Sequence, residues 1–153
     1  MSDVHIMIPK KDRPVWPDTT DVLPVEPAQM VDIPLLGWVA AGQPIDIFEN
    51  RELIAVPAEM VRKDCYALRV RGNSMIDDNI LDGDVVVVEK RTSAESGQSV
   101  VAMIHGESVT LKKFYIEKAG IRLQPANPEL NPIYLKNEEI QILGIVMGII
   151  RIP

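Results

Sequence analysis

The sequence has few of the residues that build metal centres and disulfide frameworks. Among 153 residues it contains one cysteine, Cys65, and two histidines, His5 and His105. A single cysteine excludes a disulfide within the chain, and these three scattered residues do not supply the four ligands of a structural zinc site. We therefore expect neither a metal ion nor another cofactor.

Basic residues and long apolar runs are also scarce. The chain has 16 Lys and Arg against 22 Asp and Glu, a net charge of −6. Proteins bind nucleic acids largely through Lys and Arg contacts to phosphate. This charge balance therefore disfavours a DNA-binding surface that extends over the whole chain. The longest apolar run, Ile142–Ile150, is far shorter than the roughly 20 residues of a membrane-spanning helix. The N-terminus lacks the pattern of a signal peptide, so we expect a cytoplasmic protein with no membrane segment.

Prolines gather at one end of the chain. Six of the twelve prolines lie in the first 34 residues. Each fixes φ, removes a backbone donor and disfavours helix at the residue before it. We therefore predict an extended or disordered leader over residues 1–33 and a folded domain over residues 34–153. A helix-turn-helix domain cannot be placed in such a leader, so direct DNA binding is not expected.

Beyond residue 33, short runs of β-branched residues alternate with turn residues such as Asp82-Gly83 and Ala119-Gly120. Only 57–63 has the pattern of a short helix. This pattern predicts an all-β, predominantly antiparallel fold with one short helix. The expected strands are Leu35–Ala40, Tyr66–Arg71, Asp84–Lys90, Ser99–His105, Ser108–Glu117, Ile121–Gln124 and Ile140–Arg151.

A serine and a pair of lysines are the residues that bear on chemistry. Ser74 follows a predicted strand directly, behind Gly72, where its hydroxyl can be exposed on a turn. Lys112 and Lys113 are neighbours in a predicted strand, so they must point to opposite faces and one of them projects inward. Burial lowers the pKa of a lysine, and a neutral amine near Ser74 could act as general base. By itself this pattern favours a plainer interpretation, a turn serine and solvated lysines.

Three segments occurring in order carry a more specific signal. They are Gly37-Trp-Val-Ala-Ala-Gly-Gln-Pro44, Arg71-Gly-Asn-Ser-Met-Ile-Asp77 followed by Asp82-Gly-Asp84, and Val109-Thr-Leu-Lys-Lys113. Together they resemble the self-cleaving serine peptidases that include the LexA repressors, the UmuD proteins and related phage repressors. The resemblance covers about residues 33–152 and implies the β-fold that LexA shares with signal peptidases.

The resemblance also implies a role for each matching residue. Ser74 is expected to be the nucleophile and Lys112 the general base, and the scissile bond is Ala41–Gly42 of the same chain. The backbone N–H groups of Asn73 and Ser74 are the expected oxyanion hole. The neighbouring lysine is expected to face outward as an ordinary surface residue.

Partners and biological role follow only from the family. They would be the RecA filament, which stimulates cleavage after DNA damage, and a second copy of the chain, paired through the C-terminal strand. An alternative buries that strand within one subunit. LexA-type repressors carry an N-terminal DNA-binding domain, and only the short leader precedes the peptidase region here. A UmuD-like accessory role in translesion synthesis and a non-enzymatic dimerisation partner of repressors therefore remain alternatives. A protease acting on other proteins is a third.

Overall fold

The computed structural model describes residues 29–40 and 46–151, which form one nine-stranded sheet. The strand order is β2-β1-β3-β4-β9-β5-β6-β7-β8. Among the strand pairs of the described residues only β1–β3 is parallel, which confirms the predominantly antiparallel all-β fold. The strands are β1 (Met30–Val39), β2 (Asp46–Pro57), β3 (Cys65–Val70), β4 (Val85–Glu89), β5 (Ser99–Ile104), β6 (Ser108–Glu117), β7 (Gly120–Gln124), β8 (Ile133–Leu135) and β9 (Ile140–Ile150).

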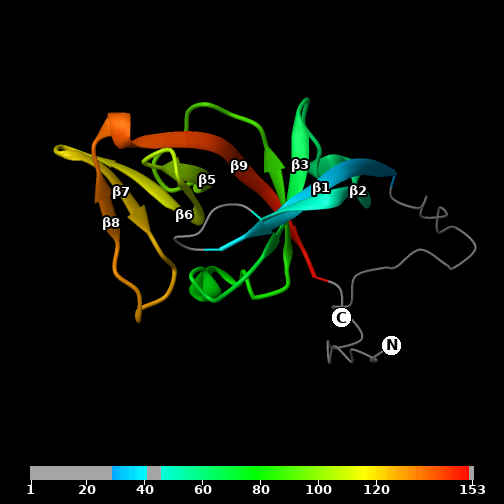
Figure 1. Ribbon diagram of the computed structural model, residues 1–153, viewed down its shortest axis with the longest axis horizontal. Coiled ribbons are helices and arrows are strands. Elements are labelled where there is room, and N and C mark those ends of the chain that lie inside the picture. The colour runs from blue at the N-terminus through cyan, green and yellow to red at the C-terminus, as the bar shows by residue number, and fades with distance from the viewer. Residues whose placement is uncertain (1–28, 41–45, 152–153) are drawn as a thin grey trace, which may run out of the picture.

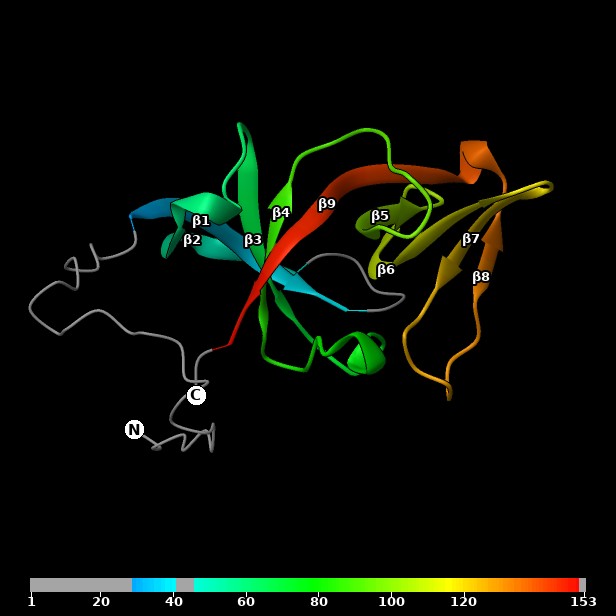
Figure 2. The ribbon, with the colours of Figure 1, turned by 180° about the vertical axis from the view of Figure 1, so that it is seen from behind.

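Strand β9 joins the two halves of this sheet (Figures 1 and 2). Its first part, 140–145, pairs with β5, and its second part, 145–150, pairs with β4. Within this chain, β9 therefore has a strand partner along its whole length. Residues 146–150 pair on one side only within the described chain, so one backbone edge of this part has no strand partner there.

The run of four valines in β4 suits its place at the centre of the sheet, where both faces are covered. Val86 and Val88 pack into one buried cluster, while Val85 and Val87 pack into another on the opposite face. A strand covered on both faces needs apolar side chains at every position rather than at alternate ones. Each fully buried valine contributes about 1.5 kcal/mol or more through the apolar area removed from water.

Several boundaries differ from those expected. Strand β1 begins at Met30, ahead of the boundary at residue 34, and residues 1–28 of the expected leader lie outside the described residues. The helix predicted over 57–63 is wrong: only a 3-10 turn, η3 (Ala58–Met60), forms, because the backbone is extended again at Val61. Two further 3-10 turns, η4 (Ile76–Asp78) and η5 (Asn137–Glu139), were not predicted.

Strands β2 and β8 were also not predicted from the sequence. The first contains the polar stretch Glu49-Asn-Arg-Glu52, which has a turn-like composition, and it becomes a strand by pairing with β1. The second has only three residues and follows a proline. No helix in the described part of the chain is long and apolar enough to span a membrane.

Candidate active site

The turn that carries Ser74 connects β3 to β4 and is held at both ends. At its start, Gly72 has a φ of +85°, which glycine adopts without strain, and its N–H donates to the Asp82 carboxylate at 2.7 Å. Further along, the Asn73 carbonyl accepts a 2.8 Å hydrogen bond from the Asn127 side chain, and Asp77 N–H donates to the backbone of a neighbouring loop at 2.7 Å. Ser74 is therefore presented from a backbone fixed by contacts distant in sequence.

Lys112 is the inward-facing lysine of β6. Its side chain is only 3% exposed, and its Nζ donates to the Thr110 hydroxyl at 2.6 Å and to the Leu111 carbonyl at 3.1 Å. No carboxylate of the described residues lies within ion-pair distance of it. Burial lowers the pKa of Lys112 from its ordinary value to about 8, because desolvation penalises the charged form. Lys113, on the other face of β6, forms an ion pair with Asp78 at 3.3 Å.

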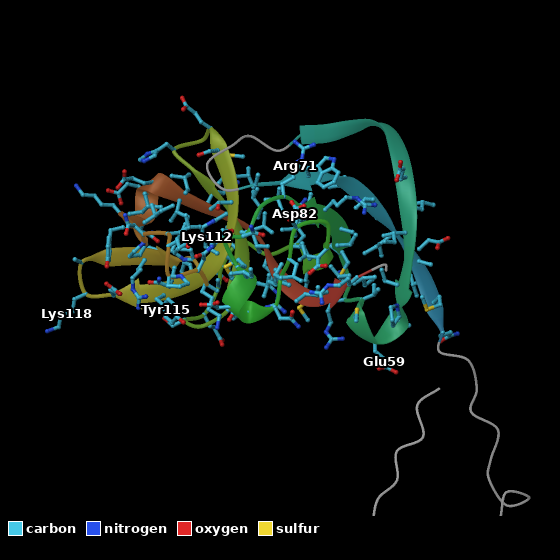
Figure 3. The ribbon with its side chains drawn as sticks, turned by 90° about the horizontal axis from the view of Figure 1, so that it is seen from below. Glu59, Arg71, Asp82, Lys112, Tyr115 and Lys118 are labelled. Atoms are coloured by element: carbon cyan, nitrogen blue, oxygen red, sulfur yellow. The ribbon has the colours of Figure 1, made fainter. Side chains whose placement is uncertain are left out.

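Ser74 and Lys112 meet at one backbone atom. The Ser74 hydroxyl donates to the Leu111 carbonyl oxygen at 3.5 Å, the same oxygen that Lys112 Nζ contacts at 3.1 Å. Strand β7 pairs with β6 only from Lys113 onward, so the edge of β6 is open to the turn at this point. Figure 3 labels Lys112 on β6, with Arg71 and Asp82 of the β3–β4 connection on the side facing it. The fold thus brings together a hydroxyl and a buried amine from the two halves of the sheet.

The expected scissile residues, Ala41 and Gly42, lie outside the described residues, but the strand leading to them is fixed. Val39 at the end of β1 is 1% exposed and packs in the same cluster as Met75. Its carbonyl accepts a 2.9 Å hydrogen bond from Arg71 N–H, so β1 ends beside the turn of the nucleophile.

The expected oxyanion-hole donors sit on the same turn. Within residues 29–40 and 46–151, no backbone hydrogen bond is donated by the N–H groups of Asn73 or Ser74. Both residues precede a short 3-10 turn, η4, and the Ser74 hydroxyl contacts the Leu111 carbonyl of β6.

Two further contributors were missed from the sequence. Thr110 is completely buried and holds Lys112; its place two residues earlier in the same strand was the available signal, since such residues share a face. The other is a pair formed by Asp84, 2% exposed, and Arg151, whose guanidinium donates to both carboxylate oxygens at 2.8 and 2.9 Å. Arg151 also donates to the Asn79 carbonyl at 3.0 Å, which ties the end of β9 to the connection carrying Ser74.

No group of three or more His, Cys, Asp or Glu side chains among the described residues could hold a metal ion. A hollow of about 550 Å³ lies away from Ser74, over Phe114, Ile121 and Ile142.

A turn serine beside a buried lysine, on a mostly antiparallel β-fold, is the arrangement of a serine peptidase-type domain. The chain belongs to the Peptidase S24-like family, whose sequence model matches residues 34–147. It is 44% identical over 143 residues to the LexA repressor of Clostridium novyi (strain NT), covering 88% of this chain and 68% of that protein. It is 45% identical over 126 residues to the LexA repressor of Clostridioides difficile (strain 630), covering 81% and 60%. The chain thus spans roughly three-fifths to two-thirds of the length of these relatives.

Proposed function

We propose that this chain is a LexA-like serine peptidase of the DNA-damage (SOS) response that cleaves its own Ala41–Gly42 bond with a Ser74–Lys112 dyad. The observation that carries the proposal is the shared Leu111 carbonyl, which places the serine hydroxyl and the lysine amine around one atom. The lowered pKa of Lys112 supports it further, because a base must be neutral near working pH to accept a proton.

The reaction runs in two steps. Neutral Lys112 takes the proton of the Ser74 hydroxyl as Oγ bonds to the carbonyl carbon of Ala41. The bond to the Gly42 nitrogen then breaks, Lys112 returns the proton to that nitrogen, and an ester joins Ser74 to Ala41. In the second step Lys112 accepts a proton from a water molecule as its oxygen bonds to the ester carbon. The bond from that carbon to Ser74 Oγ then breaks, Lys112 returns the proton to Oγ, and the new Ala41 carboxyl group loses its own proton to solvent.

Two features of the site would lower the barrier. The N–H groups of Asn73 and Ser74 would donate to the oxyanion that forms on Ala41, since fixed donors stabilise the charge that develops there. Strand β1 carries the scissile segment on the same chain as the nucleophile, which removes the entropic cost of binding a separate substrate. The hydrogen bond from Arg71 N–H to the Val39 carbonyl holds that strand two residues ahead of Ala41.

Control would act on the docking of the cleavage segment. Any partner that binds the docked chain more tightly raises the cleavage rate by shifting that population. In LexA-type peptidases this partner is the RecA filament, and we propose the same for this chain. We also propose that the chain forms a homodimer.

The test is mass spectrometry of the purified chain over time at neutral and alkaline pH, with and without activated RecA. Fragments 1–41 and 42–153 should accumulate faster at high pH and be absent from Ser74→Ala and Lys112→Ala. The matched controls are Ser93→Ala and Lys118→Ala, which remove an exposed serine and an exposed lysine outside the site and should cleave normally. A chain that stays whole under every condition would refute the peptidase proposal and favour the non-enzymatic partner role.

A further inference from the structure

Arg69, in β3, and Arg71, directly after it, lie over the aromatic ring of Trp38 in β1. The Arg71 guanidinium carbon is 4.5 Å from the centroid of the Trp38 ring, and that of Arg69 is 5.6 Å away. Trp38 pairs with Arg69 in the parallel β1–β3 ladder, so the ring and both guanidinium groups share one face of the sheet. Cations over an indole face are attracted by its quadrupole, and indole gives the strongest of these contacts.

The contact joins the two elements that must meet for cleavage. Trp38 lies three residues ahead of Ala41, whereas Arg71 begins the turn that presents Ser74. The same Arg71 donates its backbone N–H to the Val39 carbonyl at 2.9 Å. Side chain and backbone of one arginine therefore hold two successive residues of the segment that precedes the proposed scissile bond.

The arrangement also selects one register of β1. Val39 is buried, and Trp38 faces the opposite side of the strand. A slip by one residue would turn the indole into the space that Val39 fills and turn the valine outward. The space that Val39 fills is shaped for a small branched side chain, and it would not accept the larger indole ring without repacking.

We propose that Trp38, through its contact with Arg71 and Arg69, is a positioning residue that fixes the register in which the cleavage segment reaches Ser74. This inference rests on the proposed self-cleavage, and it adds a preference for a large planar side chain at position 38 beside a compact one at position 39. The contact does not touch the reacting atoms and acts through the placement of β1.

The first experiment measures self-cleavage of full-length variants by mass spectrometry. Trp38→Ala should cleave at least about fivefold more slowly than the unmodified chain, within the range that cation–π contacts give. Trp38→Phe retains an aromatic face and should recover most of the rate, which a loss of folding would not do. Tyr115→Ala is the matched control, because it removes the comparable 4.4 Å Tyr115–Arg122 contact in the other half of the sheet and should leave the rate unchanged.

A second readout is independent of catalysis. In the full chain carrying Ser74→Ala, amide hydrogen exchange at Arg71 reports its bond to Val39. Adding Trp38→Ala should speed exchange at Arg71 at least about fivefold, and adding Tyr115→Ala should not. Failure of the unmodified chain to cleave would refute the proposed function. The exchange rate at Arg71 would still show whether Trp38 holds β1 against β3. Cleavage of Trp38→Ala at the unmodified rate, or unchanged exchange at Arg71, would overturn this inference.

Discussion

The hydroxyl of Thr110 accepts a 2.6 Å hydrogen bond from Nζ of Lys112, two residues further along the same face of β6. Both side chains are buried, so this bond fixes the direction of the amine within an environment that excludes water. The position of a general base is as important as its pKa, because the proton it accepts must lie within hydrogen-bond reach.

Replacing that hydroxyl should therefore slow cleavage even when Lys112 is neutral. Thr110→Val has nearly the same shape but no acceptor, and we expect a loss of about tenfold in rate, equivalent to roughly 1.4 kcal/mol. Thr110→Ser keeps the acceptor and should retain most of the activity. The rate is to be measured above pH 9, where protonation of Lys112 no longer limits it. A valine variant as fast as the parent would show that the hydroxyl does not position the amine.

Cleavage should depend on pH through Lys112. Since burial lowers its pKa to about 8, the rate should rise roughly tenfold per pH unit well below that value and level off above it. Lys112→Arg should be inactive at every pH, because a guanidinium does not lose its proton in this range. Lys118→Ala should reproduce the parent profile. A rate that is independent of pH between 6 and 10 would contradict the assignment of Lys112 as the base.

The same lysine should make stability depend on pH in a definite direction. Its pKa is about 8 in the folded chain and roughly 10.4 when unfolded. Between these two pKa values the unfolded chain holds the proton on Lys112 and the folded chain does not. The contribution of Lys112 to the free energy of unfolding therefore rises with pH across this window and is lowest below pH 8. In the Ser74→Ala chain, Lys112→Met should remove a penalty on the order of 3 kcal/mol at pH 7. Urea unfolding from pH 7 to 10 measures it, and Lys118→Met should leave the slope unchanged.

The sequence was most informative where the structural cause is local. Runs such as Val85–Val88 predict strands because β-branched side chains suit a buried pleated surface. The adjacent lysines of β6 predicted that one points inward, because alternation in a strand is a local rule. The ion pair between Asp84 and Arg151 joins residues 67 positions apart, and no pattern in either segment predicts it. Strand β2 depends likewise on its partner β1 rather than on its own composition.

The Asp84–Arg151 pair should contribute strongly to stability because the carboxylate is buried. The Arg151 guanidinium beside Asp84 holds the pKa of that carboxyl below its usual range. The stabilisation from this pair is therefore fully present above the ordinary pKa of an aspartate, near 4. It is lost as pH falls through the lower pKa that Asp84 has in the folded chain. Arg151→Met in the Ser74→Ala chain should lower the free energy of unfolding at pH 7 by more than the loss of a surface ion pair would, since it leaves a buried carboxylate without its countercharge.

Its comparison is the Arg91–Glu89 pair, whose carboxylate is 13% exposed against 2% for Asp84, so Arg91→Met should cost clearly less than Arg151→Met. Both values come from urea unfolding at pH 7. Equal costs for the two pairs would mean that burial of Asp84 adds nothing to the interaction.

Two glycines of β9 should differ sharply in their tolerance of a methyl group. A Cβ at Gly144 would lie against the Val88 side chain and 2.6 Å from the Glu89 backbone oxygen, and backbone in a central strand cannot move aside cheaply. At Gly148 it would meet Met60 Sδ at 2.7 Å, the end of a flexible side chain that can rotate away. In the Ser74→Ala chain we expect Gly144→Ala to cost about 2 kcal/mol or more and Gly148→Ala less than about 1 kcal/mol, by urea unfolding. The opposite order would mean that Met60 is held more rigidly than β4, and that η3 rather than the central strand limits how closely β9 packs.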